Sequence, residues 1–365
     1  MAGHKKIRLQ YFLGVWLLIS QAVVAQQPIR FQNITVNEGL SMGTITAFAE
    51  DANGFIWIAT AEGLHRYDGK YLKVLKHVDG KQNSLSDSYI TSLVAVDNQL
   101  FIGNNSGIVD IYNTSTLEFE HIQISNQDSL FDHPINTIVP HNNYLYINTL
   151  GGGIWKFNIT SKELKKVKLD GKLSQNAKLV EVNKKLFLIS GYTIHSYSQS
   201  YIAEIFIADY PITTLAYYKS KYLVGTQLGL YTTNFTGPVS QVSLPPRKRL
   251  IRISRISNIL VDGETAWIGT LGGLLELQNG SINHYQNNAL RPFSLVNNNV
   301  TTLFLDQNNI LWTGTISGIS KYAPHLRKFG LLQYFDYQGT TINNNVYCTY
   351  KTTRKISGLV HYHLV

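Results

Sequence analysis

The sequence repeats one phrase, and a repeat at a regular period constrains a fold more strongly than any single residue. The best copy runs from Asp51 to Gly69 and reads DANGFIWIATAEGLHRYDG. Later copies read DGETAWIGTLGGLLEL over 262–277 and DQNNILWTGTISGISKY over 306–322. Each copy joins a turn, an apolar strand, a second turn and another strand, and such a hairpin cannot bury its faces alone. The chain is therefore expected to pack several such units together.

Turn chemistry sets the limits of the strands in this phrase. Asp51 suits the first position of a tight turn, and Gly54 suits a position where φ is positive. The run that ends at Thr60 is rich in β-branched and aromatic residues, which predicts a strand buried on both faces. Gly63 interrupts the run, and an alternating strand follows up to Tyr67.

The spacing of the copies gives the number of units. The intervals between central strands are 44, 45, 41, 36, 44 and 45 residues. Seven central strands are recognised, with their midpoints at Ile58, Ile102, Ile147, Leu188, Val224, Ile268 and Thr313. Periods of about 40–45 residues made of short strands are typical of four-stranded propeller blades. We therefore predict an all-β fold, a seven-bladed β-propeller of four-stranded antiparallel blades over residues 30–325.

The first strand predicts how the ring closes. Residues 30–36, RFQNITV, correspond to the outermost strand of a blade but have no blade of their own. The seventh copy supplies only inner strands, over 300–305, 311–315 and 318–322. Pairing the N-terminal strand onto these inner strands would leave no open edge between the first and last blades.

Both ends of the chain are expected to differ from the propeller. Residues 1–25 combine a basic start, an apolar stretch and a small-residue cleavage site, as in a secretory signal peptide, with an uncleaved anchor as the alternative. Removing them takes away three Lys/Arg and no acid, so the net charge changes from +9 to +6. Residues 326–350 begin a further repeat, the start of an incomplete second propeller. Residues 351–365 do not continue it, and we expect this aberrant tail to result from a frameshift.

The signal peptide predicts an exported, periplasmic protein. No later window reaches the roughly 18 apolar residues of a membrane-spanning helix, so no membrane span is expected in the mature chain. The single cysteine, Cys348, excludes an internal disulfide framework. A basic cluster at 245–249 could contact a polyanion or could be an ordinary solvated loop. Nucleic acid is not expected as a partner in that compartment.

The sequence shows no catalytic constellation, so we predict no enzyme activity, no cofactor and no metal. The histidines lack the spacing of metal ligands; they include His65, His77, His121, His133 and His141. Three tryptophans, Trp57, Trp267 and Trp312, stand in the middle of their strands. We expect them to pack between blades rather than stack against sugars.

The phrase D-x-x-G-x-I-W-I-A/G-T-x-x-G-L-x-R-Y, preceded by Gly-Leu-Ser, resembles the two-component regulator propeller repeat. The matching positions are Asp51, Gly54, Trp57, Thr60 and Gly63 in the first copy, and Trp267, Gly269, Thr270, Trp312, Gly314 and Thr315 in later copies. The resemblance implies the periplasmic sensor region of a hybrid two-component histidine kinase of Bacteroidetes-type bacteria. Such sensors respond to oligosaccharides and control polysaccharide-utilisation genes. Full-length relatives continue into further modules with a phosphorelay and can form homodimers, so this chain resembles a truncated sensor without kinase output.

An oligosaccharide is the expected partner, and propeller geometry indicates where it would bind. The turns between second and third strands and the links between blades share one face, and Glu62, Asn105 and Gln227 stand in those turns. We take these three as candidate ligand-binding residues, with ordinary solvated turn residues as the alternative. Two other functions stay open at this stage: a free-standing exported binding or scaffold propeller, and a polysaccharide-active propeller enzyme.

Overall fold

The structure of the protein is a computed structural model. It describes residues 29–124, 133–168, 177–198, 201–244 and 255–324, and two further strands, β29 (Tyr334–Tyr337) and β30 (Thr340–Asn343). The predicted signal peptide, the basic cluster, Cys348 and the tail lie outside the described residues. The chain divides into two compact units, 1–322 and 323–365. In the second unit, β29 pairs with β30 as an antiparallel hairpin. The predicted boundaries of the terminal segments stay predictions.

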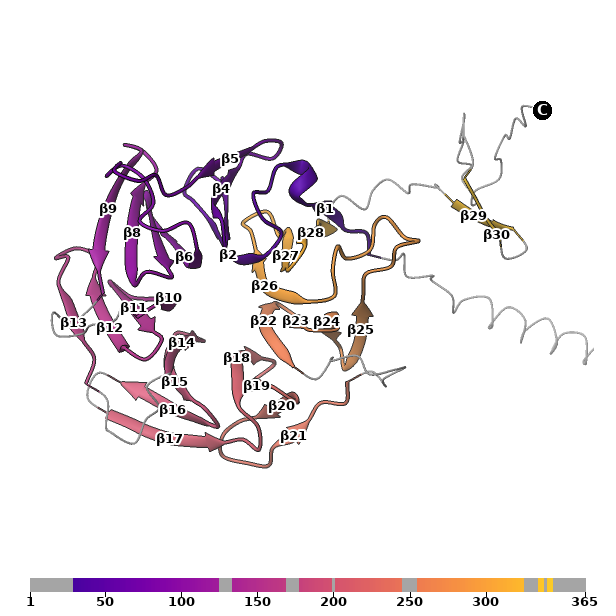
Figure 1. The fold of residues 1–365 in the computed structure, drawn as a ribbon. Coiled ribbons are helices and arrows are strands. Elements are labelled where there is room, and N and C mark those ends of the chain that lie inside the picture. The colour runs from indigo at the N-terminus through magenta and orange to yellow at the C-terminus, as the bar shows by residue number, and fades with distance from the viewer. Residues whose placement is uncertain are drawn as a thin grey trace, which may run out of the picture. The chain divides into compact units, whose positions relative to one another are not determined.

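The first unit is a ring of seven four-stranded antiparallel sheets, which confirms the predicted seven-bladed propeller (Figure 1). Blade 1 contains β2 (Ile45–Glu50), β3 (Ile56–Thr60), β4 (Gly63–Tyr67) and β5 (Leu72–Leu75), and blade 2 contains β6 (Ile90–Val96), β7 (Gln99–Asn104), β8 (Ile108–Asn113) and β9 (Glu118–Gln123). Blade 3 contains β10 (Ile135–His141), β11 (Tyr144–Thr149), β12 (Gly153–Asn158) and β13 (Leu164–Lys166), and blade 4 contains β14 (Lys178–Val182), β15 (Lys185–Ser190), β16 (Thr193–Ser198) and β17 (Tyr201–Ile207). Blade 5 contains β18 (Ile212–Tyr218), β19 (Lys221–Thr226), β20 (Gly229–Thr233) and β21 (Ser240–Gln241), and blade 6 contains β22 (Ile256–Asp262), β23 (Thr265–Thr270), β24 (Gly273–Gln278) and β25 (Ser281–Tyr285). Blade 7 contains β26 (Val300–Leu305), β27 (Leu311–Thr315), β28 (Gly318–Tyr322) and β1 (Gln32–Ile34), and a short 3-10 helix, η1 (Val36–Glu38), follows β1.

The N-terminal strand closes the ring as the fourth strand of blade 7, as predicted. β1 pairs antiparallel with β28, and Asn33 lies opposite Ser320. The Ser320 hydroxyl donates a 2.7 Å hydrogen bond to Asn33 Oδ1, and Asn33 Nδ2 donates to the Ser294 carbonyl at 3.0 Å. Phe31, just before the strand, is buried against Tyr322. The sheet of blade 7 is thus β1-β28-β27-β26, and because the chain continues from β1 into β2 of blade 1, this strand ties the first and last blades together.

One aromatic contact repeats at the boundaries between blades. The aromatic residue on the second strand of a blade packs against an aromatic residue of the next blade. The pairs are Trp57–Tyr112, Phe101–Phe157, Tyr146–Tyr197, Phe187–Phe235, Trp267–Tyr322 and Trp312–Tyr67, with ring centroids 5.5–6.2 Å apart. The three tryptophans are buried in these contacts. The structure therefore places them between blades, as expected, and Leu223 and Leu277 stand where the pair would be at the boundary of blades 5 and 6.

The glycine of the repeat's Gly-Thr end allows neighbouring blades to approach closely. A Cβ atom on Gly314 would lie 2.9 Å from Ile45 Cγ2 of blade 1 and 2.7 Å from Thr302 Cγ2. A Cβ atom on Gly269 would lie 2.8 Å from Val300 Cγ1 of blade 7. These separations are shorter than real Cβ contacts, so the first strand of the next blade occupies the space of a side chain.

Gly314→Ala is expected to lower the free energy of unfolding by about 1–3 kcal/mol, because overpacking forces the backbone or Ile45 to shift. Urea denaturation measures the change. Gly237→Ala is the matched control, since its Cβ would meet only the amide group of Asn234, at 3.2 Å. Equal losses in the two variants would contradict a special role for the blade boundary.

The link that enters a blade is anchored twice in blades 1, 2 and 7. A leucine of the link is buried, as seen for Leu40, Leu85 and Leu295. The next residue donates its backbone N–H to a polar side chain on the third strand, in the pairs Ser41–His65 (2.9 Å), Ser86–Asp110 (3.0 Å) and Val296–Ser320 (2.9 Å). This double anchor is the structural role of the Gly-Leu-Ser that precedes the phrase. Among the described residues, no helix has the length and apolar character needed to cross a membrane.

Candidate ligand face

One face of the propeller is formed by the turns between second and third strands and by the links between blades; we call it the turn face. The first residue of a turn donates its N–H to the residue that precedes the first strand of the same blade. The observed pairs are Asn105–Tyr89, Leu150–Pro134, Gln227–Pro211 and Ile316–Asn299, at 2.9–3.3 Å. Turn and link therefore form one layer, and a side chain in either can contact the same ligand.

The threonine of the repeat shapes these turns through two hydrogen bonds. Thr60 Oγ1 donates to the Gly63 carbonyl at 2.9 Å and accepts the Glu62 N–H at 3.1 Å. Thr270 and Thr315 make the same two contacts in blades 6 and 7. All three threonines are buried. The three threonines thus stabilise the turns of blades 1, 6 and 7.

The three predicted ligand residues share the turn face but lie in blades 1, 2 and 5. The Glu62 carboxylate contacts Lys76 Nζ at 3.8 Å, and its carbonyl accepts a hydrogen bond from Ser41 Oγ. Asn105 and Gln227 are exposed in the turns after β7 and β19. Glu62 thus contacts residues of its own blade. No contact among the described residues joins the side chains of Glu62, Asn105 and Gln227. Their role in ligand binding stays a prediction.

Two exposed tyrosines near Gln227 were missed by sequence reasoning. Tyr192 is 53% exposed in the turn after β15, and Tyr210 is 38% exposed in the link between blades 4 and 5. Backbone hydrogen bonds tie these segments together, from Ala208 N to the Tyr192 carbonyl at 2.8 Å and from Gln227 N to the Pro211 carbonyl at 3.0 Å. Aligning the turns of the repeats would have shown an aromatic side chain at the Tyr192 position.

We define the blade 4/5 patch as Tyr192, Asp209, Tyr210, Gln227 and Leu228. Leu228 is exposed beside Gln227, and Asp209 is exposed beside Tyr210. Burial, together with the charges of Tyr210 and Asp209, raises the pKa of Tyr231, which lies on β20 next to this patch. The patch therefore combines aromatic and apolar surface with a carboxylate and an amide, the mixture that small polar ligands require.

The histidines considered in the sequence make structural contacts. His121 Nδ1 lies 2.7 Å from Asp110 Oδ1, and its Nε2 lies 2.9 Å from the Gln82 carbonyl. Burial opposes the charged form of His121, but the hydrogen bonds to Gln82 and Asp110 raise its pKa. His141 Nδ1 contacts Glu181 at 2.9 Å. Within the described ranges, no three His, Cys, Asp or Glu side chains are placed to hold a metal ion.

Comparison with known families identifies the repeat. The model of the two component regulator propeller matches residues 39–62 and 294–317. Both segments run from the link, through the first two strands of a blade, to the turn at Thr60 or Thr315. The copy at 262–277 lies outside the two matches. No curated protein sequence matches the chain.

Solved structures share the fold. The chain is similar to the extracellular domain of the hybrid two component system BT3049 from B. thetaiotaomicron, with 18% identity and a TM-score of 0.70 over 90% of this chain and 46% of that one. It is also similar to the extracellular domain of the hybrid two component system BT4673 from B. thetaiotaomicron, with 21% identity and a TM-score of 0.67 over 90% of this chain and 44% of that one. A third structure, YCF48 bound to D1 peptide, has 12% identity and a TM-score of 0.62 over 83% of this chain and 99% of that one.

The chain spans less than half the length of the two extracellular domains that it matches. At these identities the likeness concerns the fold. Together with the family match, it confirms the resemblance on which the sequence interpretation rests. The protein is a seven-bladed propeller that carries the two component regulator propeller repeat and is similar in fold to extracellular domains of hybrid two-component systems.

Proposed function

We propose that this propeller is the exported, periplasmic sensor part of a two-component regulator and that it binds an oligosaccharide released from a polysaccharide. The observation that carries the proposal is the repeat, found in a propeller whose fold is similar to that of two extracellular domains of hybrid two-component systems. We further propose the blade 4/5 patch as the place of contact. Its tyrosines can stack on the apolar faces of sugar rings, and Asp209 and Gln227 can bond to sugar hydroxyls.

Thermal denaturation with a panel of neutral and acidic oligosaccharides tests the proposal. A ligand at 100 times its dissociation constant adds about 2.7 kcal/mol of stability to a folded protein, which is measurable as a rise in melting temperature. An unchanged melting temperature with every member of the panel, in a protein shown to be folded, would count against ligand sensing by this propeller.

Tyr192→Ala and Tyr210→Ala are each expected to weaken binding of the oligosaccharide found in that screen by about tenfold or more, because exposed aromatic anchors carry much of the energy of such contacts. Isothermal titration calorimetry measures the affinity. Tyr71→Ala is the control: Tyr71 is 64% exposed beside β5, at the third-to-fourth-strand turn of blade 1, which lies on the opposite face. Affinities that stay unchanged in both patch variants would exclude this patch as the contact surface.

A free-standing binding propeller is the second candidate. The YCF48 structure, which contains a bound D1 peptide, aligns over 99% of its own length with this chain, so a single propeller of this size can act as a peptide-binding protein. Sequencing the gene across codons 351–365 and beyond separates the candidates. Histidine kinase modules encoded in the neighbouring reading frame would support the sensor. A stop codon directly after codon 365, with no such modules in any frame downstream, would support the free-standing protein.

A further inference from the structure

The boundary between blades 5 and 6 lacks the aromatic pair that fills other boundaries. Leu223 stands at the second-strand position occupied by Trp57 and Trp312 in their blades, and Leu277 stands at the third-strand position of Tyr112. Both leucines are buried. Two leucine side chains fill less space than two aromatic rings, so this boundary is expected to be less completely packed. The ring of Tyr218, whose hydroxyl donates to the Glu264 carbonyl at 2.9 Å, takes up only part of the difference.

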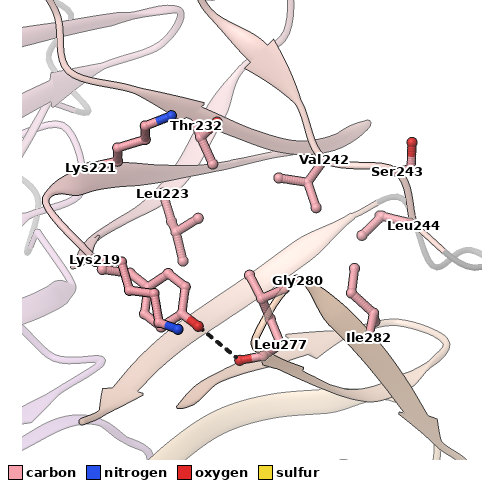
Figure 2. A pocket seen from close by; sticks show the side chains of 11 residues that line it. Lys219, Lys221, Leu223, Thr232, Val242, Ser243, Leu244, Leu277, Gly280 and Ile282 are labelled. Atoms are coloured by element: carbon pink, nitrogen blue, oxygen red, sulfur yellow. Dashed lines mark hydrogen bonds between the residues drawn. The ribbon is translucent and has the colours of Figure 1, made fainter. Parts of the chain in front are cut away.

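A cavity lies at this boundary. Its volume is about 780 Å³, and Leu223 and Leu277 are part of its wall. Figure 2 shows the side chains of Leu223, Val242, Leu277 and Ile282 arranged around the cavity. The short fourth strand of blade 5, β21, contributes to the opening because it consists of only Ser240 and Gln241.

A smaller cavity elsewhere supports this explanation. At the boundary of blades 3 and 4, the cavity measures about 360 Å³, and Tyr146 and Tyr197 are part of its wall. These two tyrosines keep the aromatic contact, with ring centroids 6.0 Å apart. The boundary that retains the rings therefore has about half the free volume of the boundary that lacks them.

The rim of the larger cavity is cationic. Lys219 and Lys221 lie in and next to the turn between β18 and β19, so the cavity opens away from the turn face. Lys219 Nζ forms an ion pair with the Glu264 carboxylate at 2.6 Å and donates a hydrogen bond to Asn279 Oδ1 at 3.2 Å. In the part of the chain that the structure describes, no carboxylate lies within 4.0 Å of Lys221 Nζ. Lys221 is therefore the cation at this rim that is available to a ligand anion.

We propose that the cavity between blades 5 and 6 binds a small aromatic carboxylate. The ligand ring lies in the cavity beside the ring of Tyr218, in contact with Leu223, Leu277 and Ile282. The carboxylate lies at the rim, where the Lys221 ammonium supplies the opposite charge and N–H donors. The cavity has the size and apolar lining that are typical of small-molecule sites. It is separate from the blade 4/5 patch and does not depend on oligosaccharide sensing.

The test measures binding of 2-naphthoate to the full chain by isothermal titration calorimetry, with uncharged 2-naphthamide as the comparison. The decisive variant is Leu223→Trp combined with Leu277→Tyr, which restores the pair seen as Trp57–Tyr112. We expect one site in the natural protein, an affinity at least tenfold weaker in the double variant, and a melting temperature that is unchanged or raised because the cavity is filled. If the double variant does not fold, Leu277→Tyr alone replaces it as the variant with the filled cavity.

A second variant tests the anionic part of the proposal. Lys221→Met is expected to weaken 2-naphthoate several-fold and to leave 2-naphthamide unchanged, since only the first ligand carries a charge. Lys184→Met, at the rim of the smaller cavity, is the matched control and should change neither affinity. The proposal is overturned if the natural protein does not bind 2-naphthoate or if the filled variant binds it equally well. It is also overturned if Lys221→Met affects both ligands alike.

Discussion

Asp51→Ala is expected to lower the free energy of unfolding by about 3–5 kcal/mol, the largest effect of any single substitution considered for this protein. The buried Asp51 carboxylate accepts three hydrogen bonds, from Asn53 N at 2.9 Å, Phe55 N at 3.1 Å and Trp57 Nε1 at 2.7 Å. Removing it leaves the indole N–H of Trp57 buried without an acceptor and also releases the turn. Urea denaturation followed by tryptophan fluorescence measures the loss.

Two other blades provide an internal replicate and a control. Asp306 makes the same three contacts in blade 7, to Asn308 N, Ile310 N and Trp312 Nε1, so Asp306→Ala should give a similar loss. Asp262 begins the corresponding turn of blade 6 but is exposed, in a tight two-residue hairpin. Asp262→Ala is therefore expected to change the free energy of unfolding by less than about 0.5 kcal/mol. A loss in Asp262→Ala as large as in Asp51→Ala would contradict this assignment.

Acid is expected to destabilise the protein through His65, by about 3 kcal/mol between pH 6.5 and pH 4. Burial, with the nearby charge of Lys76, lowers the pKa of His65 from 6.5 to about 4 in the folded protein. Its Nε2 accepts the Ser41 N–H at 2.9 Å and cannot do so once protonated. The unfolded chain binds the proton first as the pH falls, so the contribution is complete above pH 6.5 and is lost progressively toward pH 4.

His65→Gln isolates this effect, because an amide oxygen can still accept the Ser41 N–H and does not titrate. The free energy of unfolding, measured at pH 7 and at pH 4.5, should fall less in His65→Gln than in the natural protein. His121→Gln is the matched control. The raised pKa of His121 gives a contribution of opposite sign, present below pH 6.5 and lost as the pH rises through its folded pKa. An acid loss of the same size in His65→Gln would refute the role of His65.

The turn face shows where sequence reasoning reached its limit. The turn positions of Glu62, Asn105 and Gln227 follow from strand periodicity, because every second-to-third-strand turn of a ring of antiparallel blades lies on the same face. Which turn lies near which link depends on the backbone hydrogen bonds of the folded ring, such as the one from Ala208 N to Tyr192 O. Tyr192 matches no residue of the repeat and carries no motif, so its neighbourhood with Tyr210 is visible only in three dimensions.

The repeat by itself determined the blade, the number of blades and the closure by residues 30–36, because each follows from local chemistry repeated at a period. Asp51 and Gly54 form a turn, and the aromatic position of Trp57 must pack against a neighbour. The tertiary structure decided what no period contains, namely where copies depart from one another in space. Leu223 and Leu277 lie 54 residues apart in the sequence and look like ordinary apolar residues there. They leave a cavity because the ring brings them together at a boundary where other blades place aromatic rings.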